Sequence, residues 1–381
     1  MLKLVATCLF GLEKLLGEEI DALGYRRLDT IDGRVIFEAP ERAVAVCNLH
    51  LRYAERVMIL LSKFHARTFE DLFQGTKAIP WEDWIGRDGA FPVKGHSVKS
   101  ALFSLPDCQK IIKKAIADRL SSVFHLSRLP ESGTLYAVSF FLLRDEAYLM
   151  IDTTGVTLHK RGYRTQAGIA PLRETLAAAM VQLSRPREGV LLVDPMCGSG
   201  TIAIEAALLT GNIAPGLQRT FSAEAFGLLP SSVWEEERER ARGEIRPYPT
   251  KIYASDLDES CIQLAKENAR RAGVADRIEF RVADVRRFSS PEPGARGTIV
   301  TNPPYGERLG DLEEARALAA AMGKAFRENI PAWQLYIITS DEQFERFFGR
   351  RADKVRRLYN GMIRCGFYQF FRRAENVSSK K

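Results

Sequence analysis

The sequence predicts an α/β protein whose C-terminal half is a doubly wound, mostly parallel sheet of seven strands. In that half, helical patterns alternate with short β-branched strands, which is typical of a parallel sheet with helices on both faces. Asn360-Gly361 separates the last two strands and indicates an antiparallel hairpin at the end of the sheet. With 381 residues, of which 46% are hydrophobic and 27% charged, the chain is long enough for two or three globular domains.

The N-terminal half has the mixed pattern of two small α+β units. Residues 1–61 fit a ferredoxin-like unit with a hairpin at Asp32-Gly33, and residues 62–153 form a second unit. A basic, glycine-containing linker is expected at 154–166, before a third domain at 167–381. Expected strands lie at 2–10, 25–28, 34–38, 90–94, 135–143 and 146–153, and expected helices at 12–23, 42–51, 68–77 and 106–124.

The third domain contains the seven strands of the predicted parallel sheet. Open α/β sheets bind ligands at the carboxyl ends of their strands, so polar residues directly after these strands are candidate site residues. The strands are expected at 190–193, 252–255, 278–282, 298–301, 333–339, 354–358 and 361–371. Helices are expected at 171–183, 201–210, 259–272, 312–329 and 342–348.

The motif Asn302-Pro303-Pro304-Tyr305 directly follows the strand at 298–301. Two consecutive prolines fix φ near about −65° and remove two backbone donors, so this loop is rigid and can only accept hydrogen bonds there. The amide oxygen of Asn302 and a proline carbonyl can accept hydrogens from an exocyclic amine, and the ring of Tyr305 can stack on the attached base. Alone, the motif favours an ordinary turn, because Asn-Pro often opens turns.

A glycine loop follows the strand at 190–193, in the segment Asp194-Pro195-Met196-Cys197-Gly198-Ser199-Gly200-Thr201. Gly198 and Gly200 would let the backbone approach a ligand closely, and Thr201 opens the next helix. Ala203 stands where a dinucleotide-binding Gly-x-Gly-x-x-Gly motif would have its third glycine, which argues against a pyrophosphate-binding loop. No Gly-Lys-Ser/Thr follows, which argues against an NTP-binding loop. Asp194 instead suggests a cationic ligand such as an amino-acid ammonium group.

Two further strand ends carry aspartates. Asp256 is placed to accept hydrogens from ribose hydroxyls, and Asp284 to accept from an adenine amino group. Each aspartate alone is also compatible with a simple turn. Three consecutive strand ends with Asp, followed by Asn302 on a fourth, predict a ligand that is an adenosine bearing an amino acid.

Lysines in the second unit indicate a phosphate-binding surface. Lys94 and Lys99 lie beside a glycine turn, while Lys110, Lys113 and Lys114 lie three and four residues apart on the outer face of the helix at 106–124. The formal net charge of +7 also favours a polyanionic partner. A solvated helix face would explain the same lysines.

The six cysteines form no Cys-x-x-Cys pair and lie near no histidine cluster, so we expect reduced thiols, no disulfide framework and no metal. No apolar run is long enough to span a bilayer. The N-terminus lacks a basic leader and a small-residue cleavage site, so we expect a cytoplasmic protein.

Together these motifs resemble the class I S-adenosylmethionine-dependent methyltransferases that methylate exocyclic amines. The segments Leu158-His159-Lys160-Arg161-Gly162-Tyr163-Arg164 and Ala170-Pro171-Leu172-Arg173-Glu174-Thr175-Leu176-Ala177 are similar to the signature of THUMP-domain RNA methyltransferases. The chain is most similar to the bacterial branch that forms 2-methylguanosine in large-subunit ribosomal RNA. This resemblance implies a ferredoxin-like domain at 1–61, a THUMP RNA-binding domain at 62–153 and a Rossmann-like methyltransferase domain at 167–381.

The complete predicted site has three groups of residues. The catalytic loop is Asn302, Pro303, Pro304 and Tyr305. The cofactor-binding residues are Asp194, Pro195, Cys197, Gly198, Gly200, Thr201, Asp256 and Asp284. The RNA-binding residues are Lys94, Lys99, Lys110, Lys113, Lys114, Lys160, Arg161 and Arg164.

Two features depart from the simplest member of such a family. An insertion at about 212–250, with a charged helix near 234–242, separates the first two strands of the sheet, and we expect it to help cover the substrate. Longer relatives fuse a second methyltransferase domain after this one, whereas only a polar tail follows Phe371 here. One methylation activity is therefore expected.

The predicted reaction is methyl transfer from S-adenosylmethionine to the 2-amino group of guanine in 23S rRNA. The amine is a poor nucleophile, so catalysis would depend on its alignment, which contributes ~7–11 kcal/mol in favourable systems, without a metal or a dedicated base. The base must first leave its stack. The alternatives are an adenine-specific DNA or tRNA methyltransferase, and a non-catalytic RNA-binding ribosome assembly factor.

Overall fold

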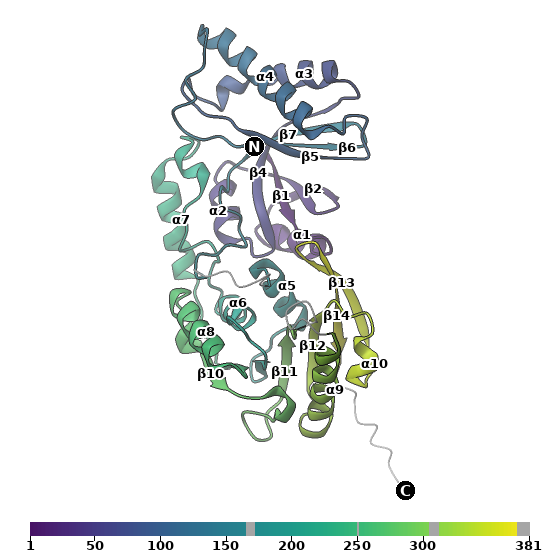
Figure 1. The fold of residues 1–381 in the computed structure, drawn as a ribbon. Helices are drawn as coiled ribbons and strands as arrows, with labels where there is room; N and C mark the ends of the chain where they lie inside the picture. Colours follow the sequence, from purple (N-terminus) through teal and green to yellow (C-terminus); the bar gives the residue numbers. More distant parts are fainter. Residues whose placement is uncertain (165–171, 250, 305–311, 372–381) are drawn as a thin grey trace. The chain divides into compact units, whose positions relative to one another are not determined.

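The computed structural model describes residues 1–164, 172–249, 251–304 and 312–371 (Figure 1). The chain divides into two compact units, each of which contains one seven-stranded sheet. The first unit comprises Met1–Cys8, Leu16–Leu158 and Arg219–Arg240. The second comprises Leu9–Leu15, His159–Gln218 and Ala241–Lys381.

The sheet of the first unit has the strand order β2-β3-β1-β4-β7-β6-β5. Its long strand β4 pairs with β1 on one side and with β7 on the other, so the predicted boundary at residue 61 falls inside a strand. The elements are β1 (Leu2–Cys8), α1 (Glu13–Ala22), β2 (Arg26–Ile31), β3 (Arg34–Ala39), α2 (Ala43–His50), β4 (Ala54–His65), α3 (Phe69–Lys77), β5 (Val93–Val98), α4 (Leu105–Phe124), β6 (Val138–Leu143) and β7 (Glu146–Asp152).

A local cap explains why helix α3 begins close to its predicted start. Thr68 accepts from the backbone N–H of Asp71, and the Asp71 carboxylate accepts from the N–H of Thr68, which together form a capping box for α3. Helix α4 buries Ile112 and Ile116 in the core beneath the sheet. The strand predicted at 90–94 lies later, at β5, because its parallel pairing with β6 begins only at Val93.

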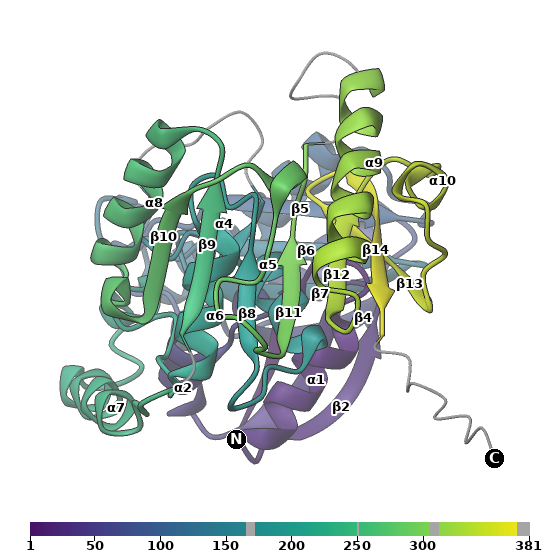
Figure 2. The same ribbon diagram turned by 90° about the horizontal axis from the view of Figure 1, so that it is seen from below.

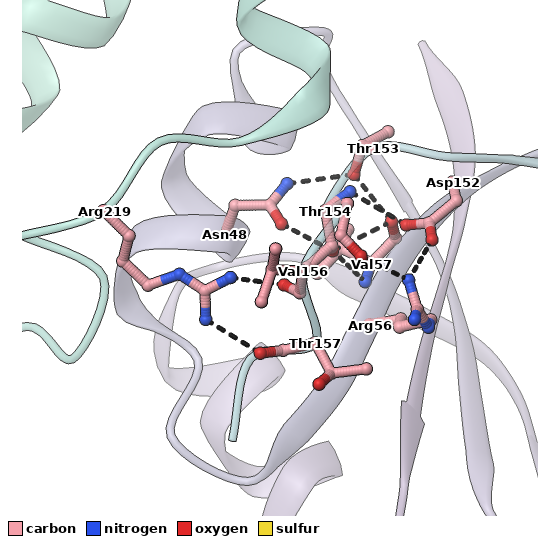
Figure 3. Close-up of polar contacts among 10 residues, drawn as sticks. Asn48, Arg56, Val57, Asp152, Thr153, Thr154, Val156, Thr157 and Arg219 are labelled. Carbon is pink, nitrogen blue, oxygen red and sulfur yellow. Dashed lines mark hydrogen bonds and ion pairs between the residues drawn. The ribbon is translucent and has the colours of Figure 1, made fainter. Parts of the chain in front are cut away.

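The predicted linker is not a solvated tether. Figure 3 shows that its first residue, Thr154, forms hydrogen bonds to β4 and α2. Thr154 is 0% exposed, and its hydroxyl donates to Asn48 Oδ1 over 2.7 Å. The Thr153 hydroxyl donates to the carbonyl of Val57 over 2.6 Å, and Arg56 pairs with Asp152. Residues 165–166 of the predicted linker lie outside the described residues.

The predicted insertion at about 212–250 lies between the first two strands of the second sheet in chain order, but most of it belongs to the first unit. In it, α7 (Ser231–Gly243) buries Trp234, which stacks on Phe221 with ring centroids 5.7 Å apart. The buried Glu237 carboxylate lies 2.8 Å from His50 Nε2. The helix therefore packs within the N-terminal unit, and the expected part of the insertion in covering the substrate stays a prediction.

The sheet of the second unit confirms the predicted fold class. Its strand order is β10-β9-β8-β11-β12-β14-β13, with parallel pairing from β10 to β12 and an antiparallel hairpin at the end (Figure 2). The elements are α5 (Glu174–Ser184), β8 (Leu191–Asp194), α6 (Thr201–Thr210), β9 (Ile252–Asp256), α8 (Glu259–Arg271), β10 (Ile278–Val282), β11 (Gly297–Thr301), α9 (Leu312–Asn329), β12 (Gln334–Thr339), α10 (Phe344–Phe348), β13 (Lys354–Asn360) and β14 (Ile363–Phe370).

The turn between β13 and β14 is shifted by one residue from the predicted Asn360-Gly361 turn. Asn360 pairs with Ile363, so Gly361 and Met362 are the two central residues. Gly361 has φ +65°, and glycine at the first central position suits a primed hairpin turn, which matches the twist of the strands. Met362 at the tip is 96% exposed.

We expect Gly361→Ala to lower the free energy of unfolding by ~1 kcal/mol, because a side chain is strained at positive φ. A Cβ there would meet only the Arg173 side chain, at 3.9 Å, so steric crowding would not add to the loss of stability. Calorimetry should show the melting temperature of the second unit falling by ~2–4 °C. Met362→Ala, at the next position, should stay within about 0.5 kcal/mol of the wild type. Equal melting temperatures for the Gly361 variant and the wild type would contradict this account of the turn.

All six cysteines are free thiols, as predicted, and Cys261 is the only one that is not buried. Among the described helices, none has the length and apolar character needed to cross a bilayer.

Candidate active site

The candidate site lies where β8 and β11 end side by side (Figure 2). From this pair the chain winds in opposite directions, through β9 and β10 on one side and through β12 on the other. Such a reversal is the topological switch point at which open α/β sheets bind ligands. The Thr301 hydroxyl, at the end of β11, donates to Asp194 Oδ1 over 2.7 Å and joins the two strand ends.

The two glycines of the loop after β8 have different roles. The N–H of Gly198 donates to Asp256 Oδ2 over 2.9 Å, and a Cβ at Gly198 would meet no atom within 4 Å, so the space beside it is open. Gly200 starts α6 with φ +83°, and a Cβ there would lie 3.0 Å from the Cβ of Ala265 on α8. Gly200 therefore serves helix packing, while Gly198 lies at the open side of the loop.

A cavity of about 680 Å³ opens at these strand ends. Six predicted site residues line it: Pro195, Gly198, Asp256, Asp284, Asn302 and Pro304. It is also lined by residues that the sequence motifs did not indicate, namely Met196, Leu257, Asp258, Ala283, Val285, Arg286, Glu314, Ala317 and Leu318. The loop residues among them adjoin predicted aspartates, whereas the three on α9 carried no signal in the sequence.

The other predicted residues of the two loops lie outside the cavity lining. Asp194, Cys197 and Thr201 are at most 7% exposed. Pro303 is buried too. Tyr305 falls outside the described residues, so its predicted stacking on the base stays a prediction.

Asn302 carries an unusual polar atom. Its amide oxygen Oδ1 is buried and has no hydrogen-bond partner within the described part of the chain. Leaving such an acceptor unsatisfied costs ~1–3 kcal/mol, so a buried one at a cavity wall marks a place where a donor is expected to bind. The residue thus offers the free acceptor that the sequence motif predicts.

Asp284 is held by its own loop. It accepts from the backbone N–H of Arg286 over 2.9 Å and pairs with the Arg286 guanidinium, with Nε and Oδ2 2.9 Å apart. Hydrogen bonding from Arg286 lowers the pKa of Asp284, so the carboxylate stays charged. Any ligand reaching Asp284 therefore meets Arg286 as well, which also lines the cavity.

Asp194 is a buried carboxyl group, 1% exposed. Burial raises its pKa to about 7, because loss of solvent outweighs the hydrogen bonds from Thr301 and the Met196 N–H, and the nearby charge of Asp256 adds to the rise. A cationic group placed beside Asp194 would favour its charged form. Its predicted contact with an ammonium group stays a prediction.

The raised pKa of Asp194 gives stability a pH dependence. The unfolded carboxyl has a pKa near 3.8, so between about pH 4 and pH 7 the folded state binds more protons, and stability falls as pH rises. From about pH 5.5 to pH 7 the wild type should lose ~1.5 kcal/mol relative to Asp194→Asn, which cannot titrate. Thermal unfolding of both proteins across this range measures the difference. A difference that does not change with pH would contradict the raised pKa.

The predicted RNA-binding lysines lie on the surface of the first unit. Lys94, Lys99, Lys110 and Lys114 are exposed, while Lys113 pairs with Glu131. Among the basic residues at 160–164, only Lys160 is exposed.

Burial corrects the assignment of Arg161 as an RNA contact. Its side chain is 2% exposed and lies 3.4 Å from the fully buried Glu205 carboxylate on α6. Leu158 and Tyr163, which lie on either side of Arg161 in the sequence, are also buried. Arg164, with a side chain 12% exposed, pairs with Glu174 over 2.6 Å. Both arginines hold the segment at 159–164 onto helices of the second unit.

The cavity fits the predicted cofactor, S-adenosylmethionine. Its volume lies within the usual range for small-molecule sites. The Asp256 carboxylate can accept from ribose hydroxyls, Leu257 and Val285 provide apolar surface for a base, and the missing side chain at Gly198 leaves room for a close approach. The described residues contain no group of three or more His, Cys, Asp or Glu side chains arranged to hold a metal ion.

Comparisons with known proteins agree with this arrangement. Residues 161–369 match the family model described as an RMKL-like methyltransferase domain, residues 3–58 match the RlmL ferredoxin-like domain, and residues 66–152 match the THUMP domain. The Bacillus subtilis protein YpsC, provisionally named an RNA methyltransferase, is 44% identical over 372 residues, which cover 97% of this chain and 95% of YpsC.

Longer relatives and a solved structure extend the comparison. The ribosomal RNA large subunit methyltransferase K/L of Psychromonas ingrahamii is 37% identical over 93% of this chain, but the chain spans only 48% of that protein. The crystal structure of SMU.472, described provisionally as a methyltransferase and complexed with SAH, is 40% identical, covers 98% of each chain and has a TM-score of 0.90. The chain therefore belongs to the family of S-adenosylmethionine-dependent methyltransferases that join a ferredoxin-like domain, a THUMP domain and an RMKL-like methyltransferase domain.

Proposed function

We propose that this protein transfers a methyl group from S-adenosylmethionine to the 2-amino group of a guanine in 23S rRNA. The observation that carries the proposal is the buried, unpartnered Oδ1 of Asn302 at the wall of the cavity that Asp256 also lines. An exocyclic amine supplies the missing donor. Its second hydrogen can be accepted by a carbonyl of the Pro303-Pro304 segment.

These two acceptors orient the amine. The lone pair of an exocyclic amine is delocalised into the ring, so the amine attacks only when its hydrogens are held and its lone pair points at the reacting carbon. Asn302 is well suited to hold the amine, because the two prolines that follow Asn302 restrict the backbone at this position. S-adenosylmethionine, when bound, supplies the electrophilic methyl group.

The cofactor is proposed to lie along the three other strand ends. Asp256 would accept from the ribose hydroxyls, and Gly198 would allow the chain to pass close to the ligand. Asp284 and Arg286, which line the same cavity, would contact the adenine edge. Asp194, at the end of β8, would stabilise the ammonium group.

Two observations support RNA as the substrate. The chain carries a THUMP domain, and relatives that share 37% identity with it are named ribosomal RNA large subunit methyltransferases. Exposed lysines on β5, in the β5–α4 turn and on α4 provide contacts for phosphate groups, as expected for a module that reads folded RNA by its shape and backbone. The chain spans about half of those K/L relatives, so their complete activity need not be present here.

Mass spectrometry of nucleosides from rRNA, tRNA and DNA tests the proposal. Cells lacking the protein should lose 2-methylguanosine from 23S rRNA, and wild-type protein, but not Asn302→Ala, should restore it. Loss of a methylated adenine from DNA or tRNA would support the rival activity instead. Unchanged nucleosides, with no S-adenosylmethionine binding by calorimetry, would support a non-catalytic role in ribosome assembly.

A further inference from the structure

The β13–β14 hairpin projects beyond the strand ends that carry the candidate site. Thr301, the last residue of β11, pairs with Ile337 of β12, which pairs with Tyr368 of β14, which pairs with Val355 of β13. Val355 is therefore the residue of β13 that is level with the end of β11. Strand β13 runs parallel to β11 and continues five residues past Val355, to Asn360. At ~3.3 Å per residue the hairpin tip extends ~17 Å past the level at which β11 ends. The tip therefore extends beyond the carboxyl ends of the parallel strands, the same end of the sheet at which Asn302 lies.

This hairpin and the turn before it are strongly basic. Residues 350–364 hold six basic residues and one acidic residue, so they contribute +5 to a chain whose net charge is +7. The basic residues are Arg350, Arg351, Lys354, Arg356, Arg357 and Arg364. Near the tip, Arg357 is exposed, and Arg364 has only a loose 3.8 Å pairing with the exposed Glu342. Such a density of positive charge fits a polyanion.

The tip also presents apolar groups to solvent. Met362, at the second position of the turn, is 96% exposed. Beside it on β13, Tyr359 contacts the half-exposed Phe10 of the same unit edge to face, with centroids 6.0 Å apart. Flexible thioethers and aromatic rings can cover the faces of unstacked bases, so the tip combines groups for phosphates with groups for bases.

Protection of the sheet edge explains part of this pattern. β13 is an edge strand, and lysine or arginine on an edge strand prevents pairing with another chain. Edge protection explains neither the extension of the hairpin past the site nor an almost fully exposed methionine at its end. Those two features fit a partner that reaches the carboxyl ends of the strands, where the substrate is proposed to bind.

We propose that the hairpin tip binds the RNA strand beside the nucleotide held at Asn302. Arg357 and Arg364 contact its phosphates, and Met362 covers a neighbouring base that has lost its stacking partner. This inference rests on the proposed function, because it takes RNA as the substrate of the same site. It gives the second unit an RNA-binding surface of its own, separate from the lysines of the first unit.

Binding of deproteinised 23S rRNA from cells lacking the protein tests the inference. Filter binding at several salt concentrations would compare the full-length wild type with Arg357→Ala/Arg364→Ala and with Met362→Ala. Lys266→Ala/Arg270→Ala removes the same charge from exposed positions on α8 and is the matched control. Calorimetric binding of S-adenosylmethionine, unchanged in every variant, establishes that each is folded.

We expect the double arginine variant to lower the slope of log K against log salt by ~1.4, as the loss of two single-strand phosphate contacts predicts. Its KM for rRNA should rise about tenfold with kcat little changed. Met362→Ala should lower kcat/KM about threefold without changing the salt slope. If the hairpin variants and the control behave alike while the wild type methylates rRNA, the hairpin inference is overturned and the proposed function stands. If the wild type neither binds nor methylates this RNA, both fail.

Discussion

Asn302→Ala is expected to lower the rate of methyl transfer by ~10²–10³-fold, the usual effect of removing one preorganised hydrogen-bonding group from a reacting centre. The variant loses the buried Oδ1 that we propose holds the amine, while Asp256, which we propose accepts from the ribose, is untouched. Binding of S-adenosylmethionine should therefore stay within about threefold of the wild type. Single-turnover methylation of rRNA, with calorimetry for the cofactor, measures both quantities.

Two further variants sharpen this test. Asn302→Asp keeps an acceptor oxygen at the same place and should retain more activity than Asn302→Ala. Asn329→Ala removes another amide of the second unit, one that donates to the Phe288 carbonyl over 2.8 Å outside the cavity lining, and should match the wild type in rate. Equal rates for Asn302→Ala and the wild type would show that the unpartnered oxygen is not where the amine is held.

Arg161→Ala is expected to destabilise the second unit by ~3–5 kcal/mol, because it leaves the buried Glu205 carboxylate without its paired charge. Burial alone would lower the pKa of Arg161, but Glu205 and Glu174 raise it, so the guanidinium is charged in the folded protein. Tyr163 also donates to Glu205, over 3.1 Å, and cannot replace a full charge. Calorimetry of the whole chain should show the melting temperature of this unit falling by roughly 10 °C.

The double variant Arg161→Met/Glu205→Leu separates loss of charge pairing from loss of packing. Apolar residues of similar size often replace a buried ion pair without loss, so the double variant should recover most of the stability. Arg271→Ala on α8 breaks a pair whose side chains are 36% and 46% exposed and should cost at most about 1 kcal/mol. A melting temperature of Arg161→Ala as high as that of Arg271→Ala would contradict this role for the buried pair.

Local sequence patterns predicted the parts of the site whose geometry is set by neighbouring residues. The seven strands of the second sheet lie close to their predicted positions, because β-branched runs between helices have few alternative structures. Asn302, Asp256 and Asp284 line one cavity as expected, because each lies at, or within two residues of, the carboxyl end of a parallel strand, and these ends share an edge.

Features that depend on distant partners were not predictable in this way. Strand β4 crosses the predicted boundary at residue 61, because it bonds to β1 on one side and to β7, about ninety residues later, on the other. Arg161 looked like an RNA contact because a basic, glycine-containing segment usually lies in solvent, and only its packing against Glu205 shows otherwise.

The sequence by itself determined the order of strands and helices, the rigid Asn-Pro-Pro loop and the carboxylates at the strand ends, since each depends on residues close together in the chain. The tertiary structure alone decided which of those groups face the cavity, which glycine serves packing, where helix α7 docks and which hydrogen-bond acceptor is left without a donor. These properties arise from burial and from contacts between residues far apart in sequence, and no local pattern records them.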